Sequence, residues 1–267
     1  MRLKDFFKDK IVWITGASSG IGEATALASI DLGATVIASA PSVDELEISK
    51  AKASAPERFW VLPLDLSKPD TLAPLAAEVI NKFGRIDILM NNAGISQRSK
   101  VLDTPMENDR LIMEIDYFGA VILTKAVLPI MIAQGGGHIL CTSSMVGLFG
   151  FPLRSGYSAA KHALHGFFES LRLEYYNDNI KVGIIVGGRI HSAISMNALT
   201  GDGTPYSQMD EGQQNGISPQ KAAKQILRGI RRNKREIRVG GKELIMIFLK
   251  RWFPHLHFKL SKKIKPT

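Results

Sequence analysis

The chain has 267 residues, 45% of them hydrophobic and 22% charged, and a formal charge of +9 at pH 7. This apolar content suits one large core and is too high for a disordered chain. Cys141 is the single cysteine, which excludes an internal disulfide and a thiolate metal cluster. We therefore expect a cytoplasmic protein without a metal site, and not a disulfide-stapled secreted scaffold.

The positive charge is concentrated near the C-terminus. Residues 221–267 hold fifteen Lys or Arg against two acids, Glu236 and Glu243. Such an asymmetry indicates either an acidic partner surface or a solvated basic tail. No apolar run is expected to reach the ~18 residues that cross a bilayer, and residues 1–10 lack the apolar stretch of a secretory signal.

Short apolar runs alternate with longer amphipathic stretches along most of the chain. Strands are predicted at residues 11–15, 35–39, 59–64, 86–90, 138–142, 181–186 and 236–239. Helices are predicted at residues 20–32, 69–82, 106–134, 155–177 and 219–233. This alternation is typical of βαβ units, and the nearly all-apolar middle strands indicate a parallel sheet that is covered on both faces.

The sequence has no repeat or linker that would divide this series. Residues 1–240 are therefore predicted to form a single domain, followed by a basic, apolar extension at residues 241–267. A polar stretch at residues 192–217 is too long for an ordinary connection, and we interpret it as a functional loop beside the substrate.

A glycine-rich turn directly follows the first predicted strand. It reads Thr-Gly-Ala-Ser-Ser-Gly-Ile-Gly over residues 15–22 and leads into a helix. Backbone N–H groups at a helix start and the positive end of the helix dipole can hold a pyrophosphate, while glycines let the backbone approach it closely. Because strand, spacing and helix agree, the turn predicts a dinucleotide site rather than a simple connection.

Asn91, Asn92, Ala93 and Gly94 follow the fourth predicted strand, and with the glycine spacing they resemble the short-chain dehydrogenase/reductase family. The resemblance covers roughly residues 8–240 and implies an α/β fold, the doubly wound Rossmann fold with a seven-stranded, mainly parallel sheet flanked by helices. It also implies a nicotinamide dinucleotide cofactor. The implied cofactor contacts are Gly16, Ser18, Ser19, Gly20, Ile21, Gly22, Ala40, Asp65, Leu66, Asn92, Ala93, Gly94, Tyr157, Lys161, Ile190 and Ser192.

Two of these assignments concern the adenosine end. By the resemblance Asp65 contacts the adenine and residues 92–94 lie along the ribose, although Asp65 alone would be interpreted as a helix cap or loop acid. The second strand ends in Ser-Ala-Pro-Ser at residues 39–42, without a carboxylate that would repel a 2′-phosphate. The arginine that often pairs with that phosphate is also missing, and Ser19 stands where some relatives carry a lysine. We expect NADP ahead of NAD.

Tyr157 and Lys161 lie four residues apart at the start of a helical stretch, on one face. An ammonium near a phenol favours the phenolate, which can exchange a proton with an alcohol or a carbonyl. By itself such a pair is common on helix surfaces, but Ser144 ends the fifth strand thirteen residues before Tyr157. By the resemblance Tyr157 is the general acid/base, Ser144 polarises the substrate oxygen, and Lys161 lowers the pKa of Tyr157 and holds the nicotinamide ribose.

Three positions depart from the family pattern. Asp116 stands where the family usually has an asparagine in its proton relay, Gly187-Gly188 replaces Pro-Gly, and Ser192 replaces a threonine whose hydroxyl holds the nicotinamide amide. An ionised Asp116 near Lys161 would form an ion pair and weaken the positive field at Tyr157. We include Asp116 among the catalytic candidates and expect a phenol that ionises at higher pH than in asparagine-bearing relatives.

The sequence between the catalytic serine and tyrosine is apolar, which favours an oily ketone or alcohol as substrate. These side chains could equally pack the loop itself. They are Met145, Val146, Leu148, Phe149, Phe151, Pro152 and Leu153.

The C-terminal stretch 244–265 is apolar, aromatic and basic together. It is too short and too charged to span a membrane, but it has the composition of an interfacial anchor on an anionic leaflet. A helix packing across a dimer and a flap over the substrate pocket are the alternatives. The extension resembles that of the membrane-associated branch of the family, which includes hydroxysteroid dehydrogenases. We expect no nucleic-acid partner, because no recognised binding motif is present.

The sequence thus predicts an NAD(P)-dependent oxidoreductase that interconverts a secondary alcohol and a ketone or aldehyde on a lipid-like or steroid-like substrate. The alternative is a dinucleotide-binding sensor or scaffold with weak catalysis, docked through its basic C-terminal segment. By the resemblance we expect a homodimer or homotetramer built on the helices around residues 106–134 and 155–177. The protein would be cytoplasmic, with peripheral membrane attachment as an option.

Overall fold

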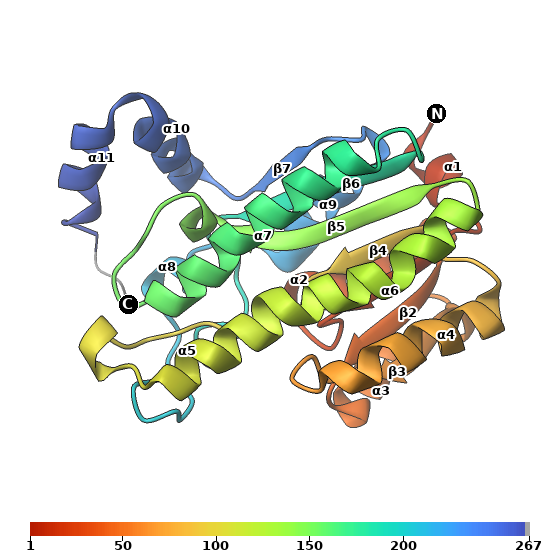
Figure 1. Cartoon of the computed structure of the whole chain (residues 1–267), viewed down its shortest axis with the longest axis horizontal. Coiled ribbons are helices and arrows are strands. Elements are labelled where there is room, and N and C mark those ends of the chain that lie inside the picture. Colours follow the sequence, from red (N-terminus) through yellow and green to blue (C-terminus); the bar gives the residue numbers. More distant parts are fainter. Residues whose placement is uncertain (265–267) are drawn as a thin grey trace.

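The computed structural model describes residues 1–264. Seven strands form one sheet in the order β3-β2-β1-β4-β5-β6-β7, and all neighbouring pairs are parallel (Figure 1). The strands are β1 Ile11–Thr15, β2 Thr35–Ala40, β3 Phe59–Pro63, β4 Ile88–Asn91, β5 Gly137–Ser144, β6 Ile180–Gly187 and β7 Glu236–Val239. The doubly wound Rossmann fold is confirmed, and each predicted strand is present with its ends displaced by at most two residues.

Helices cover both faces of this sheet (Figure 1). One layer contains α4, α6 and α7, whose apolar residues join one buried cluster, and the other contains α2 and α9, which belong to a second cluster. The α-helices are α1 Leu3–Phe7, α2 Gly20–Asp31, α3 Val43–Lys50, α4 Leu72–Phe83, α5 Met106–Met113, α6 Gly119–Ala133, α7 Ser155–Glu174, α8 Glu211–Gln214, α9 Pro219–Arg231, α10 Ile245–Trp252 and α11 Pro254–Ser261. Burial on both faces explains why the strands are almost wholly apolar.

The predicted helix at residues 106–134 is not continuous α-helix. A π-helical turn, Glu114–Phe118, separates α5 from α6 and places Asp116 on its buried side. Single π turns inside helices are frequent at functional sites. The expectation that no apolar run could span a bilayer was wrong, because the helical stretch Met106–Ala133 is long and apolar enough. Half of its most apolar window is buried inside the protein, as in a helix that covers a sheet.

The short helices α1, α3 and α8 were not predicted, and for the segment of α10 and α11 a helix was only one of the alternatives. The helix α3 carries its own start signal, since Ser42 caps it by accepting a hydrogen bond from the Glu45 backbone N–H at 3.3 Å. The loop at residues 192–217 contains the short α8. It is held by three isolated bridges, of which one joins Leu199 to Gln97.

The C-terminal helices α10 and α11 pack on each other and stand away from the sheet (Figure 1). Met246 and Ile247 of α10 are buried in the main core, and His257 of α11 stacks edge-on against Phe149 with ring centroids 4.7 Å apart. This anchors the helical pair beside the β5–α7 loop. Residue 265 of the predicted basic segment 244–265 lies outside the described residues.

Candidate active site

Two adjoining cavities lie at the carboxyl ends of the strands, where open α/β sheets bind ligands. The dinucleotide cleft, about 330 Å³, runs along the glycine-rich turn and the ends of β2, β3 and β4. The substrate cavity, about 200 Å³, lies between β5, the loop before α7 and α10. Both cavities are lined by Ile21, Thr142, Tyr157, Ser192 and Ile194.

The glycine-rich turn packs directly against the loop after β4. A Cβ at Gly16, which has φ +66°, would lie 2.8 Å from the Ala93 Cα, and one at Gly22 would lie 2.0 Å from the Gly16 oxygen. Side chains are therefore excluded at both positions. Ser19 is the N-cap of α2, and among the described residues its side chain makes no capping hydrogen bond. Ser19, Gly20 and Ile21, at the start of this helix, line the cleft. This geometry suits a pyrophosphate.

Most of the predicted cofactor residues line the dinucleotide cleft, with two exceptions. Gly22 lies behind the turn, and Ile190 lines the substrate cavity instead. The residues that do line the cleft are Gly16, Ser18, Ser19, Gly20, Ile21, Ala40, Asp65, Leu66, Asn92, Ala93, Gly94, Tyr157, Lys161 and Ser192.

Asn92 joins three strand ends. Its side-chain amide donates to the backbone oxygens of Thr15 and Gly16 at 3.0 and 3.3 Å, and its oxygen accepts from the Thr142 hydroxyl at 3.2 Å. Asp65 accepts from the backbone N–H and hydroxyl of Ser67, which holds the pKa of its carboxyl below the ordinary value. Asn92 therefore shapes the cleft through the backbone, whereas Asp65 stabilises its own turn.

The sequence interpretation missed an acid in the dinucleotide cleft. Glu45, in the first turn of α3, lines the cleft together with Ala40 and Pro41. Helix α3 had not been predicted, so nothing in the sequence placed this carboxylate beside the end of β2. Among the described lining residues Lys161 supplies the only cation.

Ser144, Tyr157 and Lys161 come together where the two cavities meet. The Ser144 hydroxyl accepts from the Val146 N–H and donates to the Gly187 oxygen, both at 3.4 Å, and it lines the substrate cavity. Lys161 Nζ lies 5.5 Å from the centre of the Tyr157 ring and donates to the Thr142 oxygen at 3.0 Å. Helix α7 thus presents a phenol and an ammonium to the end of β5.

Asp116 lies beneath the residues that follow β4. One carboxylate oxygen accepts from the Ile95 N–H at 2.7 Å, the other lies 3.1 Å from Lys161 Nζ, and no Cβ would fit at Gly94 without pressing on it. Burial raises the pKa of Asp116 while Lys161 opposes that rise. Burial lowers the pKa of Lys161, but the charges of Asp116 and Tyr157 outweigh it and leave that pKa raised. The expected ion pair is present.

The pKa of the Tyr157 phenol is raised above its ordinary value. Burial is the main cause, the positive charge of Lys161 opposes it, and the negative charge of Asp116 adds to it. A hydrogen bond with Ser144 lowers the pKa in turn. The balance of these effects favours the protonated phenol of Tyr157 over its phenolate.

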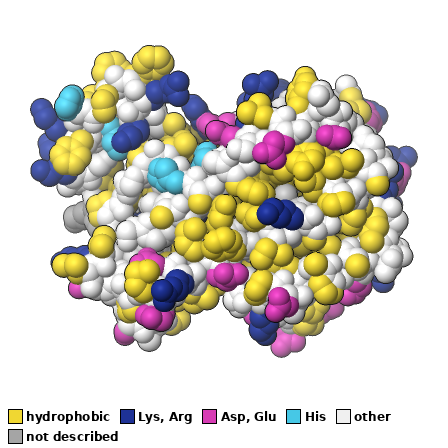
Figure 2. All heavy atoms as spheres, viewed as in Figure 1, with side chains coloured by type: hydrophobic (Ala, Val, Ile, Leu, Met, Phe, Trp, Pro, Cys, Tyr) yellow, Lys and Arg dark blue, Asp and Glu magenta, His cyan; other side chains and the backbone are white. Residues whose placement is uncertain are grey.

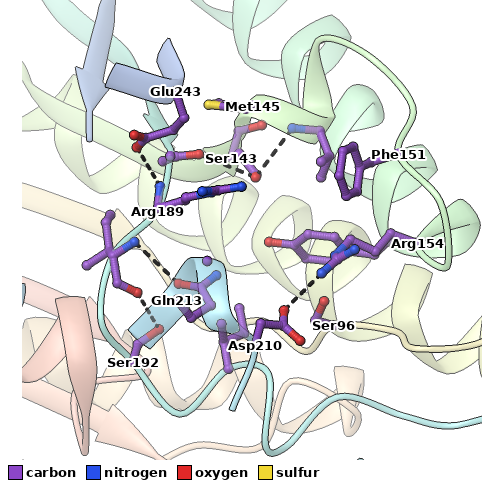
Figure 3. Close-up of a pocket in the computed structure, with 18 of the residues that line it drawn as sticks. Ser96, Ser143, Met145, Phe151, Arg154, Arg189, Ser192, Asp210, Gln213 and Glu243 are labelled. Atoms are coloured by element: carbon purple, nitrogen blue, oxygen red, sulfur yellow. Dashed lines mark hydrogen bonds and ion pairs between the residues drawn. The ribbon is translucent and has the colours of Figure 1, made fainter. Parts of the chain in front are cut away.

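The substrate cavity has an apolar side and a charged side. Met145, Val146, Phe149 and Phe151 line it as expected, whereas Leu148, Pro152 and Leu153 do not. The charged side was missed. The buried Arg98 donates to both oxygens of Asp210. Arg154 contacts the same carboxylate at 2.9 Å (Figure 3). These three residues are far apart in the sequence and share no motif. Further lining residues are Ser96, Gly187, Gly188, Arg189, Gly212, Gln213, Glu243, Met246 and Ile264.

The other two departures from the family pattern, Gly187-Gly188 and Ser192, line the substrate cavity, and Ser192 also lines the dinucleotide cleft. Gly188 is closely covered by Glu243, whose oxygen would lie 2.3 Å from a Cβ there, and the same carboxylate accepts from the Arg189 N–H at 2.7 Å (Figure 3). The Ser192 hydroxyl donates to the Ile190 oxygen at 3.3 Å. Gly188 thus lets Glu243 approach the backbone that follows β6.

A parallel doubly wound sheet with a glycine-rich dinucleotide cleft and an adjoining Ser-Tyr-Lys cluster defines a nucleotide-dependent oxidoreductase of the Rossmann type. The family model for short chain dehydrogenases matches residues 10–202. The chain belongs to the short-chain dehydrogenase/reductase family, and it is an oxidoreductase that acts on CH–OH groups.

Its relatives include two curated proteins. A dehydrogenase/reductase SDR family protein 7-like of Anopheles gambiae is 42% identical over 95% of this chain and 82% of its own. A dehydrogenase/reductase SDR family member 7B of Mus musculus is 39% identical over 89% of this chain and 75% of its own.

Solved structures agree with the fold. A short-chain dehydrogenase from Streptomyces avermitilis superposes with a TM-score of 0.80 at 30% identity, covering 95% of both chains. A metagenomic short-chain oxidoreductase in complex with NADP has a TM-score of 0.65 at 29% identity, covering 68% of this chain and 84% of its own.

Proposed function

We propose that the protein interconverts a secondary alcohol and a ketone or aldehyde on an apolar, lipid-like or steroid-like substrate, with NADP ahead of NAD as cofactor. The observation that carries this proposal is the meeting of Ser144, Tyr157 and Lys161 where the dinucleotide cleft joins the substrate cavity.

The cofactor fits the residues present. The first turn of α2 would hold the pyrophosphate, residues 92–94 would lie along a ribose, and Lys161 and Ser192 would hold the nicotinamide end. When bound, the nicotinamide supplies or accepts the hydride. The NADP complex of the metagenomic relative supports NADP, while Glu45 in the cleft would oppose a 2′-phosphate.

Proton transfer is assigned to Tyr157. In the reductive direction its hydroxyl donates to the carbonyl oxygen, and in the oxidative direction its phenolate accepts the proton of the alcohol. Ser144 would donate a second hydrogen bond to the same oxygen, since its side chain borders the substrate cavity. Lys161 favours the phenolate by its charge, an effect that Asp116 reduces.

Turnover of NADPH with a panel of apolar ketones tests this function. Tyr157→Phe should retain NADPH binding and lose turnover by at least about a hundredfold, the usual contribution of a general acid. Retained turnover in Tyr157→Phe would overturn the assignment. The Asp116–Lys161 ion pair favours the alternative, a dinucleotide sensor with weak catalysis, and tight NADPH binding without turnover of any ketone would support it.

We also propose that the α10–α11 pair docks on an anionic membrane surface. Phe248, Trp252, Phe253 and Phe258 are each about half exposed or more, and residues 244–264 contain five Lys or Arg and no acid. Figure 2 shows apolar and basic side chains together on this part of the molecule. A cytoplasmic protein would attach in this way as a peripheral one.

Co-sedimentation with anionic vesicles tests the docking. Replacing Trp252, Phe253 and Phe258 by serine should abolish pelleting, and high salt should weaken it because surface charges are screened. Serine at the exposed Leu102 and Leu173, which lie elsewhere, is the matched control. Equal pelleting by both variants would refute the membrane proposal.

A homodimer or homotetramer built on α5, α6 and α7 is proposed as the assembly. Hydrophobic side chains gather on the face of α6 and α7 (Figure 2), and Leu111 and Phe118 beside them are exposed. Light scattering after size exclusion tests this, with Phe118→Asp expected to yield monomers.

A further inference from the structure

Gln97 is buried in the segment that follows β4, with 1% of its surface exposed. Its side-chain oxygen accepts from the backbone N–H groups of Gly156 at 2.8 Å and Tyr157 at 3.4 Å. Its amide nitrogen donates to hydroxyl oxygens at 2.8, 3.2 and 3.3 Å. These three oxygens belong to Thr104, Ser99 and Ser155.

Gln97 accepts from the first amides of helix α7. The N-cap residue is Arg154, and a guanidinium has no acceptor atom with which to cap the first amides of a helix. The side-chain oxygen of Gln97, 60 residues before Tyr157 in the sequence, accepts from these amides instead. A cap of this kind fixes both the position and the direction of the first helical turn, which carries Tyr157.

The segment around Gln97 also holds the substrate loop. Ser96 O accepts from the Leu199 N–H at 2.8 Å, and Arg98 N–H donates to Leu199 O at 2.7 Å. The Arg98 side chain binds Asp210 of the same loop. Ser96 and Arg98 therefore contact the loop while Gln97 contacts α7.

We propose that Gln97 is the positioning residue that fixes Tyr157 against the substrate cavity and links it to the substrate loop. This rests on the proposed function of Tyr157. Gln97 does not touch the reacting atoms, but it holds the backbone of the residue that does. A small displacement of a catalytic group can cost about a hundredfold in rate.

The test compares Gln97→Met with Gln97→Glu. Methionine has a similar length but cannot accept the two amides, so kcat should fall by ten- to a hundredfold, with little change in KM for the ketone and in the Kd for NADPH. Glutamate keeps the acceptor, and the neighbouring hydroxyls can turn to donate to it. Gln97→Glu should recover most of kcat, with the pH limb of alcohol oxidation moved to higher pH by the added negative charge near Tyr157.

Gln134→Met is the matched control. Gln134 also bridges backbone groups, accepting from the Ile86 N–H at 3.1 Å and donating to the Ile86 oxygen at 2.7 Å, but it lies at the amino end of the sheet. This variant should lower the melting temperature without changing kcat. An equal loss of kcat in both methionine variants, or none in Gln97→Met, would overturn the positioning role.

A readout independent of turnover separates this inference from the proposed function. The chain has five tyrosines, so 15N-tyrosine labelling yields five amide resonances, and Tyr157→Phe identifies one of them. Hydrogen exchange of the Tyr157 amide should be at least tenfold faster in Gln97→Met and unchanged in Gln134→Met. Unchanged exchange in Gln97→Met would refute the cap, whatever reaction the protein catalyses.

Discussion

Asp116 Oδ2 lies 3.1 Å from Lys161 Nζ, and both side chains are almost completely buried. The ammonium that should favour the Tyr157 phenolate therefore shares its charge with a carboxylate. A buried pair of this kind is weak evidence for stability, because desolvation offsets the attraction. The ion pair matters instead for the ionisation of Tyr157, because the charge of Asp116 raises the pKa of the phenol.

Asp116→Asn should move the pH limb of alcohol oxidation to lower pH. In the proposed mechanism oxidation needs the phenolate, so its rate should rise with pH as Tyr157 ionises. The charge of Asp116 raises the pKa of Tyr157, and its removal lowers that pKa. Asparagine can still accept from the Ile95 N–H. Steady-state rates across pH measure the shift, with the exposed Glu174→Gln on α7 as control, and an unchanged limb would contradict the hypothesis.

Glu45→Gln should strengthen NADPH binding several-fold and leave NADH binding nearly unchanged. The carboxylate lines the cleft beside Ala40 and Pro41, where a 2′-phosphate would add negative charge. The repulsion would act on NADPH alone, because NADH has no 2′-phosphate. Fluorescence titration with both nucleotides measures the ratio, and an equal change for both would place the adenosine end elsewhere.

Gly22→Ala should abolish dinucleotide binding and destabilise the fold, because a Cβ there would lie 2.0 Å from the Gly16 oxygen. Gly166→Ala is the contrasting variant: this glycine lies within α7, and no atom that a Gly-to-Ala substitution would crowd lies within 4 Å of a Cβ there in the described part of the chain. Alanine there should stabilise the protein by about 0.5–1 kcal/mol, since helix interiors favour it over glycine. Thermal melts and NADPH titration check both, and loss of binding in Gly166→Ala would refute the distinction.

The protein should lose stability as pH falls from about 6.5 to 4, partly through His138. Burial lowers the pKa of this imidazole to about 4, with Lys10 and Lys181 adding to the effect. The unfolded chain binds the proton below pH 6.5 while the folded protein resists it, so acid favours unfolding by up to about 3 kcal/mol. Urea melts at several pH values should show a shallower decline for His138→Phe. An identical decline would exclude His138 as a cause.

Local signals in the sequence predicted much of the site. The glycines at residues 16–22 lie within one turn of the backbone, and Tyr157 and Lys161 lie one helical turn apart. Local backbone geometry therefore fixes their relative positions. Strand ends follow from apolar runs, which is why Ser144 and residues 92–94 were placed at one edge of the sheet.

Residues that act across the fold carry no such signal. Gln97, Glu45 and Asp210 come to the site from three loops or helix starts, and none belongs to a spacing pattern with its partners. Helix α3 was missed because its polar sequence has no clear apolar period, and Glu45 was missed with it. Sequence spacing predicts contacts only between residues a few positions apart. Contacts between more distant residues depend on how the helices and strands pack.

The sequence by itself determined the parallel sheet, the glycine-rich turn and the candidate side chains for proton transfer, because each is encoded in short-range periodicity and spacing. Only the tertiary structure decided that Asp116 pairs with Lys161, that Gln97 caps the helix of Tyr157 and that α10 closes one side of the substrate cavity. These contacts join residues many positions apart, and they form because a buried charge or amide must find a partner inside the folded core.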